Sequence, residues 1–364
     1  MPAILRCAAQ PPLSHEPLAY GPTHRSKGPP LTSISDKSAR VPEFLPDTDA
    51  EAFIGRLNDA LVLAGLGSPL PGTPERPMLF VSGGPRSGTT FCAQTLCRAF
   101  RLGWIDHLAA RFWKAPAAGV ALSRIVHGEW ADRSTDRAFE SGYGRTSDPS
   151  DIHGFHYFWM SELGLGEPAT LFESPSERGI TPFSIAAHLT EIERNAAAPM
   201  IFKGYYPSYF MKWFCDAFPT AVFVLIRRTP LDQARSIYRA RLAYNGEPSS
   251  WWSMLPPEHE SLQDLEPADQ IAGQVLGLRR MFARQLSEDG TRCVVVDYED
   301  LTKKPAMALE RIGRSVTQLT GSVLPGTGVL PAVSDRSADR ATEIDAELEA
   351  ALERLADWDE PWPT

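Results

Sequence analysis

The chain has 364 residues, with a hydrophobic content of 43%, a charged content of 22% and a formal net charge of −9. These values are ordinary for a globular protein and allow one large α/β domain or two smaller ones. The negative charge argues against general nucleic-acid binding, because no basic surplus is present to meet a phosphate backbone, but a local basic pocket is still possible.

Cysteine usage and hydropathy predict a cytoplasmic protein. The five cysteines are an odd number and form no Cys-x-x-Cys pair, which argues against a disulfide framework and for reduced thiols. No apolar run approaches the roughly 18 residues that a bilayer span requires. The N-terminus lacks the charged region, apolar stretch and cleavage site of a secretion signal.

Composition divides the chain into three parts. Residues 1–45 are rich in Pro, Ser and His without apolar periodicity, so we expect a disordered or loosely packed segment. Residues 46–320 have the pattern of an α/β domain, with an aromatic, histidine-rich cap over about 104–168. Residues 321–364 indicate a linker and a C-terminal helix. Apolar spacing predicts helices over 49–66, 268–286 and 344–358.

Five short apolar runs have the length of buried strands: residues 78–81, 170–173, 200–203, 221–226 and 293–297. Helical stretches separate them, and this alternation predicts a P-loop-like parallel β-sheet with helices on both faces. Ligands of such sheets bind outside the carboxyl ends of the strands, so the residues that follow these strands should face one crevice.

The most informative stretch is residues 80–91, Phe-Val-Ser-Gly-Gly-Pro-Arg-Ser-Gly-Thr-Thr-Phe, which joins a predicted strand to a helical pattern. Such a loop cradles an anion, because backbone N–H groups point inward and the helix dipole adds positive charge. Laid over the Walker pattern, the loop has Thr89 where a nucleoside triphosphatase has lysine. We therefore expect a different anion, held by the backbone, Arg86 and the hydroxyls of Ser87, Thr89 and Thr90.

Two further stretches combine a strand end with a helix start. The strand 221–226 ends in Arg227 and Arg228, and Thr229 (N-cap) with Pro230 then predicts a helix that contains Ser236. Arg228 should lie at the crevice, whereas Arg227 is equally well explained as a surface charge. Residues 294–305, Val-Val-Val-Asp-Tyr-Glu-Asp-Leu-Thr-Lys-Lys-Pro, form another strand, turn and helix start.

Together these three stretches resemble the sulfotransferase superfamily, whose members use 3′-phosphoadenosine 5′-phosphosulfate (PAPS). Pro-Arg-Ser-Gly-Thr-Thr at 85–90 is similar to the family's 5′-phosphosulfate loop, and Arg-x-Pro-x-Asp-x-x-x-Ser at 228–236 is similar to its 3′-phosphate motif. Tyr-Glu-Asp-Leu at 298–301, followed by a Lys-Pro pair, is similar to its downstream element. The motifs stand in the family's order over roughly residues 77–315.

The resemblance implies a sulfotransferase that transfers the sulfuryl group from PAPS to a hydroxyl or amine, and releases 3′,5′-bisphosphoadenosine. It makes Arg86 the catalytic cation and implies no metal; we also find no metal-ligand spacing in the sequence. The implied nucleotide contacts are the 5′-phosphate with Ser87, Gly88, Thr89 and Thr90, the 3′-phosphate with Arg228 and Ser236, and the adenine with Phe91 and Tyr298.

The sequence departs from the family pattern at the general base. The cytosolic branch has Lys-Thr-His-Leu-Pro before the 3′-phosphate strand, and the matching run at 203–207 is Lys-Gly-Tyr-Tyr-Pro. Lys203 is kept and could touch the sulfuryl oxygens, but Tyr205 replaces the histidine, and a phenol with a pKa near 10 is a poor base at neutral pH.

Other residues must then supply the base. We expect His153 in the cap first, because histidine titrates near neutral pH, and Glu173 second, at the end of a predicted strand. Asp106 and His107 rank below these two. An aromatic group in the cap could line an acceptor pocket or fill the core: Trp104, Phe112, Trp113, Phe155, Tyr157, Phe158 and Trp159.

The acceptor and the oligomeric state stay open at this stage. A small molecule or a carbohydrate would both suit the acceptor side. Two other functions compete with sulfuryl transfer: a P-loop nucleotide kinase or NTPase, which the threonine in the lysine position disfavours, and a degenerate sulfotransferase fold that only binds nucleotide.

Overall fold

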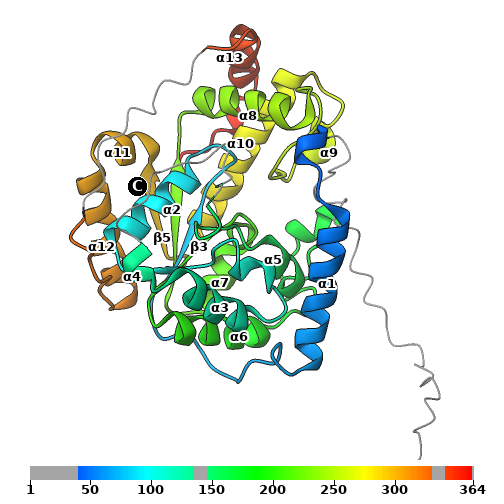
Figure 1. Ribbon diagram of the computed structural model, residues 1–364. Helices are drawn as coiled ribbons and strands as arrows, with labels where there is room; N and C mark the ends of the chain where they lie inside the picture. The colour runs from blue at the N-terminus through cyan, green and yellow to red at the C-terminus, as the bar shows by residue number, and fades with distance from the viewer. Residues whose placement is uncertain (1–39, 134–145, 147, 330–340, 363–364) are drawn as a thin grey trace, which may run out of the picture.

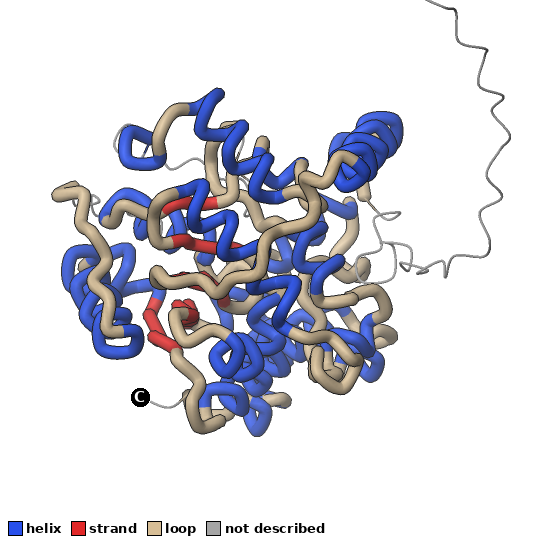
Figure 2. The backbone as a smooth tube through the Cα atoms, turned by 90° about the horizontal axis from the view of Figure 1, so that it is seen from below, coloured by secondary structure: helices blue, strands red, loops and turns tan. Residues whose placement is uncertain are grey.

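The computed structural model describes residues 40–133, 146, 148–329 and 341–362. Within them, five parallel strands form one sheet in the order β2-β3-β1-β4-β5 (Figure 1). The strands are β1 (Met78–Ser82), β2 (Gly103–Trp104), β3 (Met200–Lys203), β4 (Ala221–Arg227) and β5 (Cys293–Asp297). Helices lie on both sides of the sheet (Figure 2), which confirms the predicted α/β class.

The helices that surround the sheet have the following bounds. They are α1 (Thr48–Leu63), α2 (Thr89–Ala99), α3 (Pro116–His127), α4 (Trp130–Arg133), α5 (His156–Glu162), α6 (Pro182–Ala196), α7 (Met211–Ala217), α8 (Pro230–Asn245), α9 (His259–Leu262), α10 (Pro267–Leu286), α11 (Tyr298–Lys303), α12 (Pro305–Thr320) and α13 (Asp345–Arg354). Short 3-10 turns occur at Pro42–Phe44, Ala109–Arg111, Pro168–Leu171, Pro207–Phe210 and Ala356–Trp358.

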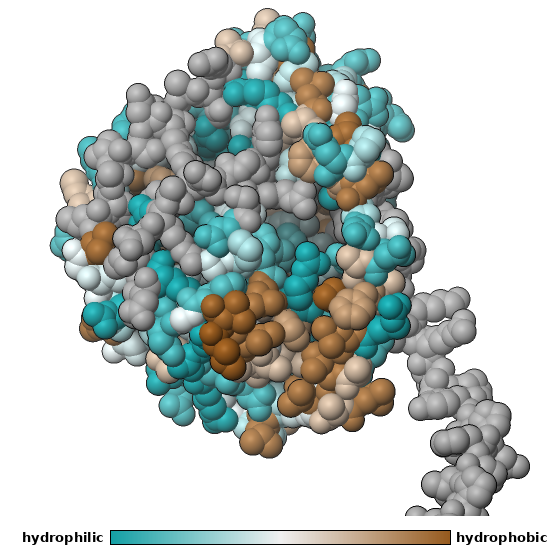
Figure 3. All heavy atoms as spheres, viewed as in Figure 1, coloured by the Kyte–Doolittle hydropathy of each residue, from teal (hydrophilic) through white to brown (hydrophobic). Residues whose placement is uncertain are grey.

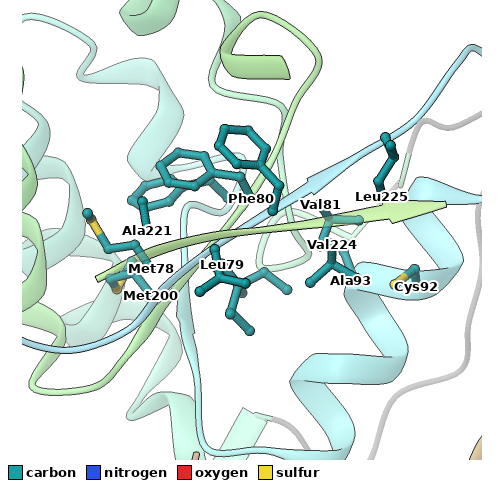
Figure 4. Packing of buried hydrophobic residues seen from close by; sticks show 14 of the residues in the cluster. Met78, Leu79, Phe80, Val81, Cys92, Ala93, Met200, Ala221, Val224 and Leu225 are labelled. Carbon is teal, nitrogen blue, oxygen red and sulfur yellow. The ribbon is translucent and has the colours of Figure 1, made fainter. Parts of the chain in front are cut away.

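The core sits on both faces of β1, because side chains alternate along a strand. Leu79 and Val81 point towards α2, where Cys92 and Ala93 pack, while Phe80 points to the opposite face (Figure 4). The Phe80 ring is 1% exposed and lies 5.1 Å from the Phe223 ring and 5.2 Å from the Phe214 ring, centroid to centroid. β1 is thus anchored on both sides just before the loop that follows it.

Part of the aromatic group in the cap lies in the core. Trp104, Phe155, Phe158 and Trp159 are buried, and Trp159 packs against the core ring of Phe80. For these four, the core alternative is therefore correct. On its outer side the cap exposes apolar residues at the end of α3, and Figure 3 shows hydrophobic residues gathered over α3 and beside α1.

One predicted strand is wrong and one real strand was missed. Residues 170–173 are not extended: a 3-10 turn spans Pro168–Leu171, and the Thr170 hydroxyl donates to the Glu167 carbonyl at 2.6 Å. The proline and this local hydrogen bond favour a turn over a strand. β2 has only two residues, too few for a periodic signal, and β3 pairs with it.

Helix ends differ from the predictions by a few residues. The predicted helix 49–66 is α1 (Thr48–Leu63), and Asp47 caps it by accepting from the backbone N–H groups of Asp49 and Ala50. The predicted helix 268–286 starts one residue earlier, and 344–358 is α13 plus a 3-10 turn. Most of the predicted loose segment 1–45 lies outside the described residues.

Two general predictions concern cysteines and membranes. The four cysteines that the structure describes, Cys92, Cys97, Cys215 and Cys293, are free thiols. None of the described helices combines the length and the apolar content that a bilayer span requires.

We expect Phe80→Ala to lower the free energy of unfolding by about 3–5 kcal/mol, because it leaves a cavity between packed rings. Phe183→Ala is the matched control, since Phe183 is 65% exposed on α6 and its loss should cost at most about 0.5 kcal/mol. Urea unfolding of both variants measures the difference; equal costs would contradict the described core.

Candidate active site

The loop between β1 and α2 ends in a glycine with a left-handed backbone. Gly88 is the N-cap of α2 with φ of 102°, and a Cβ there would lie 2.4 Å from the Tyr298 ring. Arg86 has φ of 64°, a left-handed conformation that is strained for a residue with a side chain. The loop therefore keeps its shape only while its surroundings hold it.

Three hydrogen bonds from the end of β4 and from α8 hold this loop. Arg228 Nη1 donates to the carbonyl oxygen of Arg86 at 2.8 Å, and Gln233 Nε2 donates to the carbonyl oxygen of Pro85 at 2.8 Å. Arg86 Nε in turn donates to Ser236 Oγ at 2.9 Å, across 150 positions of sequence. The predicted 5′- and 3′-phosphate motifs thus meet at the carboxyl ends of β1 and β4.

The two arginines at the end of β4 have different surroundings. Arg227 forms a two-point ion pair with Asp297 at the end of β5, with N–O distances of 2.6 and 3.0 Å. That hydrogen-bonded pair raises the pKa of Arg227 and lowers the pKa of Asp297. Arg228 is 7% exposed, and its guanidinium carbon lies 4.7 Å from the centre of the Tyr298 ring. Arg227 therefore has a structural role, whereas Arg228 contacts the loop between β1 and α2.

The start of α8 follows the prediction only in part. The helix begins at Pro230 with Thr229 as its N-cap residue, as the sequence predicts. The Thr229 hydroxyl, however, donates to the Asp232 carboxylate at 2.6 Å and makes no side-chain hydrogen bond to the helix backbone. The helix start is therefore set by the proline and this local side-chain pair.

Two observations on the loop are compatible with an anionic ligand. Ser87 Oγ is buried and has no hydrogen-bond partner among the described residues, although a buried hydroxyl normally has one. A Cβ on Gly83 would lie 2.5 Å from this hydroxyl, so the cradle admits only glycine there. Both observations fit an anion whose oxygens lie against the loop.

The residues implied for adenine lie next to each other. The Phe91 and Tyr298 rings are 6.2 Å apart, edge to face, and both side chains are largely buried. Thr90 is buried and Thr89 half-buried at the start of α2. Contacts of these four residues with a nucleotide stay predictions.

Lys203 ends β3 beside the start of the loop, paired in register with Val81. The pKa of its ammonium group is lowered to about 8, mainly by burial; the Asp151 carboxylate opposes this change and Arg86 adds to it. Lys203 and Arg86 therefore place two positive groups at the same edge of the sheet. Neighbouring Tyr205 has its pKa raised by burial, which makes it a still poorer base.

A group of imidazoles lies next to Lys203. The ring of His153 is 4.9 Å from that of His107 and 5.9 Å from that of His156, centroid to centroid. Burial lowers the pKa of His153 well below its usual value, and His156, His107 and Lys203 act in the same direction. Burial also lowers the pKa of His107. Both rings are therefore neutral at neutral pH.

Hydrogen bonds distinguish the two rings. His153 Nδ1 accepts from the Phe155 N–H at 3.0 Å, so the neutral ring has its hydrogen on Nε2 and no second lone pair. His107 Nε2 lies 2.7 Å from Thr146 Oγ1, and the same hydroxyl lies 3.4 Å from the Ile152 carbonyl oxygen, to which it can donate. In the tautomer in which His107 donates from Nε2 to Thr146, the ring keeps a lone pair on Nδ1, the better arrangement for a base.

The two carboxylates considered as bases lie in different settings. Asp106 is fully buried and holds the cap together: it accepts from the Ala109 N–H at 2.8 Å and from Arg133 at 3.0 Å. Glu173 is exposed after the turn that replaces the predicted strand, and its carbonyl accepts from Arg178 at 3.3 Å. The reason given for Glu173, a strand end facing the crevice, no longer holds.

Sequence reasoning missed a carboxylate next to Lys203. Asp151 Oδ2 accepts from Gln94 Nε2 of α2 at 2.7 Å, and Oδ1 accepts from the Ile152 N–H at 2.6 Å. The Asp-x-His spacing of Asp151 and His153, which puts both side chains on one face of an extended segment, is the signal that could have revealed it.

A model described as "Sulfotransferase family" matches residues 77–316 of the chain. The chain belongs to this family. The match covers the loop, the 228–236 motif and the 298–301 element, and so confirms the resemblance drawn from them. A comparison with curated proteins found no match.

Solved sulfotransferases match the chain at low identity and low TM-score. STF9 from Mycobacterium avium is 15% identical, with 90% of this chain and 82% of that chain covered and a TM-score of 0.47. STF1 from Mycobacterium tuberculosis H37Rv is 14% identical, covering 79% and 74%, with a TM-score of 0.40. The sulfotransferase from Alicyclobacillus acidocaldarius is 16% identical, covering 78% and 99%, with a TM-score of 0.38. Likeness this low transfers no residue or substrate.

We expect Gly88→Ala to destabilise the protein more than Gly321→Ala does. Both glycines have a left-handed backbone, which costs alanine about 1–2 kcal/mol. Only at Gly88 would the added methyl group also collide with a ring, since nothing lies within 4 Å of a Cβ at Gly321. Thermal unfolding of both variants measures the extra loss, and equal melting temperatures would contradict the close contact between the loop and Tyr298.

Proposed function

We propose that the protein transfers the sulfuryl group of PAPS to a hydroxyl or amine of a small molecule or carbohydrate. The observation that carries the proposal is the hydrogen bond between Arg86 and Ser236, which joins the two predicted phosphate motifs at one edge of the sheet. Family membership supports the transfer reaction, and the geometry of the loop supports a donor with phosphates at both ends.

The nucleotide would be held at two ends. The loop N–H groups at the start of α2, with the hydroxyls of Ser87, Thr89 and Thr90, would bind the 5′-phosphate. Arg228 and Ser236 would bind the 3′-phosphate, and Phe91 with Tyr298 would flank the adenine. PAPS supplies an activated sulfuryl group with 3′,5′-bisphosphoadenosine as its leaving group.

Arg86 and Lys203 would provide the charge stabilisation. Transfer of this kind proceeds in line through a loose transition state, so catalysis depends on positioning and on positive groups near the oxygens that gain charge. Arg86 would face the leaving 5′-phosphate and Lys203 the sulfuryl oxygens. Among the described residues, no group of three or more His, Cys, Asp or Glu side chains could hold a metal.

The proton of the acceptor would pass to the imidazole pair next to Lys203. The sequence favours His153, whereas the hydrogen bonds favour His107, which keeps a lone pair on Nδ1. The acceptor would lie beside the half-buried aromatic residues Trp113, Tyr157 and Tyr205. Such rings suit a sugar face or an aromatic ring.

The competing functions have weaker support. A nucleoside triphosphatase would need a cation in place of Thr89. It would also need a carboxylate at a strand end to bind Mg²⁺; Asp297 lies at the end of β5 but is paired with Arg227. A protein that only binds nucleotide would not need Lys203 and two neutral imidazoles beside the loop.

Turnover of PAPS tests the proposal directly. The purified chain is incubated with PAPS and a panel of alcohols, phenols, sugars and amines, and release of 3′,5′-bisphosphoadenosine is followed. Acceptor-dependent release supports the proposal. Tight binding of the nucleotide with no turnover across the panel would favour the protein that only binds.

We expect Arg228→Ala to weaken binding of 3′,5′-bisphosphoadenosine by about 10- to 100-fold more than it weakens binding of 5′-AMP, because a charged hydrogen bond to the 3′-phosphate is lost in addition to the bond that holds the loop. Arg227→Ala is the matched control: the neighbouring arginine is paired with Asp297 and should leave both affinities nearly unchanged. Calorimetry measures both ligands, and wild-type affinity in Arg228→Ala would refute the 3′-phosphate assignment.

We expect His107→Ala to lower kcat by about 10²–10⁴-fold, the usual contribution of a general base, and His153→Ala to lower it less. The acid limb of kcat/KM should fall below pH 6.5, since a depressed histidine pKa keeps the base neutral until the pH drops through it. A larger loss in His153→Ala would restore the order that the sequence suggests. Full activity in both variants would refute the imidazole base.

A further inference from the structure

Residues 356–362, which follow α13, lie against α10. α13 itself lies beside α8 and α10 (Figure 1), and the 3-10 turn Ala356–Trp358 contacts α10 directly. This segment lies outside residues 77–316, the part of the chain that the family model matches. Family membership therefore assigns it no role.

Two neighbouring acidic residues hold the segment to arginines of α10. Arg279 forms a two-point ion pair with Asp359, with N–O distances of 2.6 and 3.3 Å. Arg284 Nη2 and Nε lie 3.1 and 3.3 Å from Glu360 Oε1. The Arg279 side chain is 14% exposed and that of Arg284 is 61% exposed, so the pair with Asp359 is the better shielded from water and the more firmly held.

Trp362 holds Arg279 from a second side. Trp362 is 7% exposed, and its Nε1 donates to the Arg279 carbonyl oxygen at 3.1 Å. The guanidinium carbon of Arg279 lies 5.5 Å from the centre of the same ring, and the Phe282 ring packs edge to face against it at 6.1 Å. An arginine held by a carboxylate and an aromatic ring has little rotational freedom left.

The fixed guanidinium reaches the predicted 3′-phosphate motif. Arg279 Nη1 donates to the carbonyl oxygen of Arg228, directly after β4, at 3.3 Å. A cavity of about 10 Å³ is lined by both arginines, by Trp362 and by Gly84 of the loop between β1 and α2. This is the room of a single water molecule, so the segment packs closely against the residues that hold the loop.

Arg228 is thus held through its side chain and through its backbone. The side chain donates to the carbonyl oxygen of Arg86, and the carbonyl of Arg228 accepts from Arg279. The backbone sets where the Arg228 guanidinium points, because a side chain has only a few staggered positions about a fixed backbone. Asp359 balances the charge of Arg279, which would otherwise repel Arg228 at short range.

We propose that Arg279, held by Asp359 and Trp362, is a positioning residue that fixes Arg228 for the 3′-phosphate of the nucleotide. This rests on the proposed function, in which Arg228 binds that phosphate. Residues 356–362 then support the nucleotide site through α10 without touching the ligand. Loss of the bond from Arg279 should loosen the turn after β4 and weaken the contact with the 3′-phosphate more than the contact with the 5′-phosphate.

Arg279→Leu and Arg284→Leu form a matched pair. Each removes an arginine of α10 and its ion pair with the segment, and leucine is a good helix former at both places. The guanidinium of Arg279 also donates to Arg228, whereas among the described residues that of Arg284 bonds to Glu360 alone. A general loosening of the segment would appear in both variants, and an effect on Arg228 in Arg279→Leu alone.

The first readout is hydrogen exchange without ligand, followed by mass spectrometry on peptides that cover residues 226–236. We expect these amides to exchange about 3- to 10-fold faster in Arg279→Leu than in the wild type, because one hydrogen bond that anchors the turn is lost. Arg284→Leu should match the wild type there. Equal exchange in all three proteins overturns the proposal.

The second readout compares two nucleotides by calorimetry. The ratio of the Kd of 3′,5′-bisphosphoadenosine to that of 5′-AMP should rise about 3- to 10-fold in Arg279→Leu and keep its wild-type value in Arg284→Leu. A merely structural loss lowers both affinities alike and leaves the ratio unchanged, which overturns the proposal. In the Arg228→Ala background, Arg279→Leu should change the ratio no further, since the two residues act as a unit; a full additive change there also overturns the proposal.

Should Arg279→Leu not fold, Asp359→Ala and Glu360→Ala test the same contact from the surface. Asp359→Ala releases the guanidinium of Arg279 and should speed exchange and raise the Kd ratio by about 2- to 5-fold, the effect of one lost ion pair. Glu360→Ala should change neither quantity. An unchanged or lower ratio in Asp359→Ala overturns the proposal.

The hydrogen-exchange measurement requires no nucleotide. Faster exchange in Arg279→Leu alone, with no binding of 3′,5′-bisphosphoadenosine to the wild type, would refute the proposed function and support the anchoring of Arg228 by Arg279. Preferential binding of the bisphosphate over 5′-AMP by the wild type, with an unchanged ratio in Arg279→Leu, would do the reverse.

Discussion

The hydrogen bond from Arg228 to the carbonyl oxygen of Arg86 is the interaction on which the site depends. Arg86 has a left-handed backbone that costs free energy, so the loop would relax if nothing held it. Arg228 and Gln233 hold two successive carbonyls of this loop. As a result the loop keeps its shape without a ligand, and binding costs little ordering.

The topology of the sheet explains why positive side chains gather in one place. Parallel strands deliver Arg86, Lys203 and Arg228 to one edge of the sheet, and partial burial makes each charge more effective there than in water. Burial, and to a smaller extent the nearby Arg86, lowers the pKa of Lys203, and the Asp151 carboxylate opposes this change. A bound polyanion would oppose it too.

Local features of the site could be predicted from the sequence, because short-range rules set them. Gly88 at the start of α2, Pro230 as the first residue of α8 and Arg228 at the end of β4 follow from turn chemistry and strand length. The role of Arg227 did not, since it depends on Asp297, which lies 70 positions away.

The acceptor side was harder to predict because it is built from long-range contacts. Gln94 meets Asp151 across 57 positions, and the tautomers of His107 and His153 depend on Thr146 and on a backbone N–H. Residues 170–173 were misjudged for the opposite reason: a local turn outweighed an apolar run. Amino-acid composition reveals neither these long-range contacts nor the local preference for a turn.

Calorimetric binding of 3′,5′-bisphosphoadenosine and of ATP with Mg²⁺ to the wild-type chain tests the central claim most directly. A crevice that grips phosphates at both ends of one adenosine should bind the bisphosphate without metal, and much more tightly than ATP with Mg²⁺. Preferential binding of ATP with Mg²⁺, or no binding of the bisphosphate, would contradict the account.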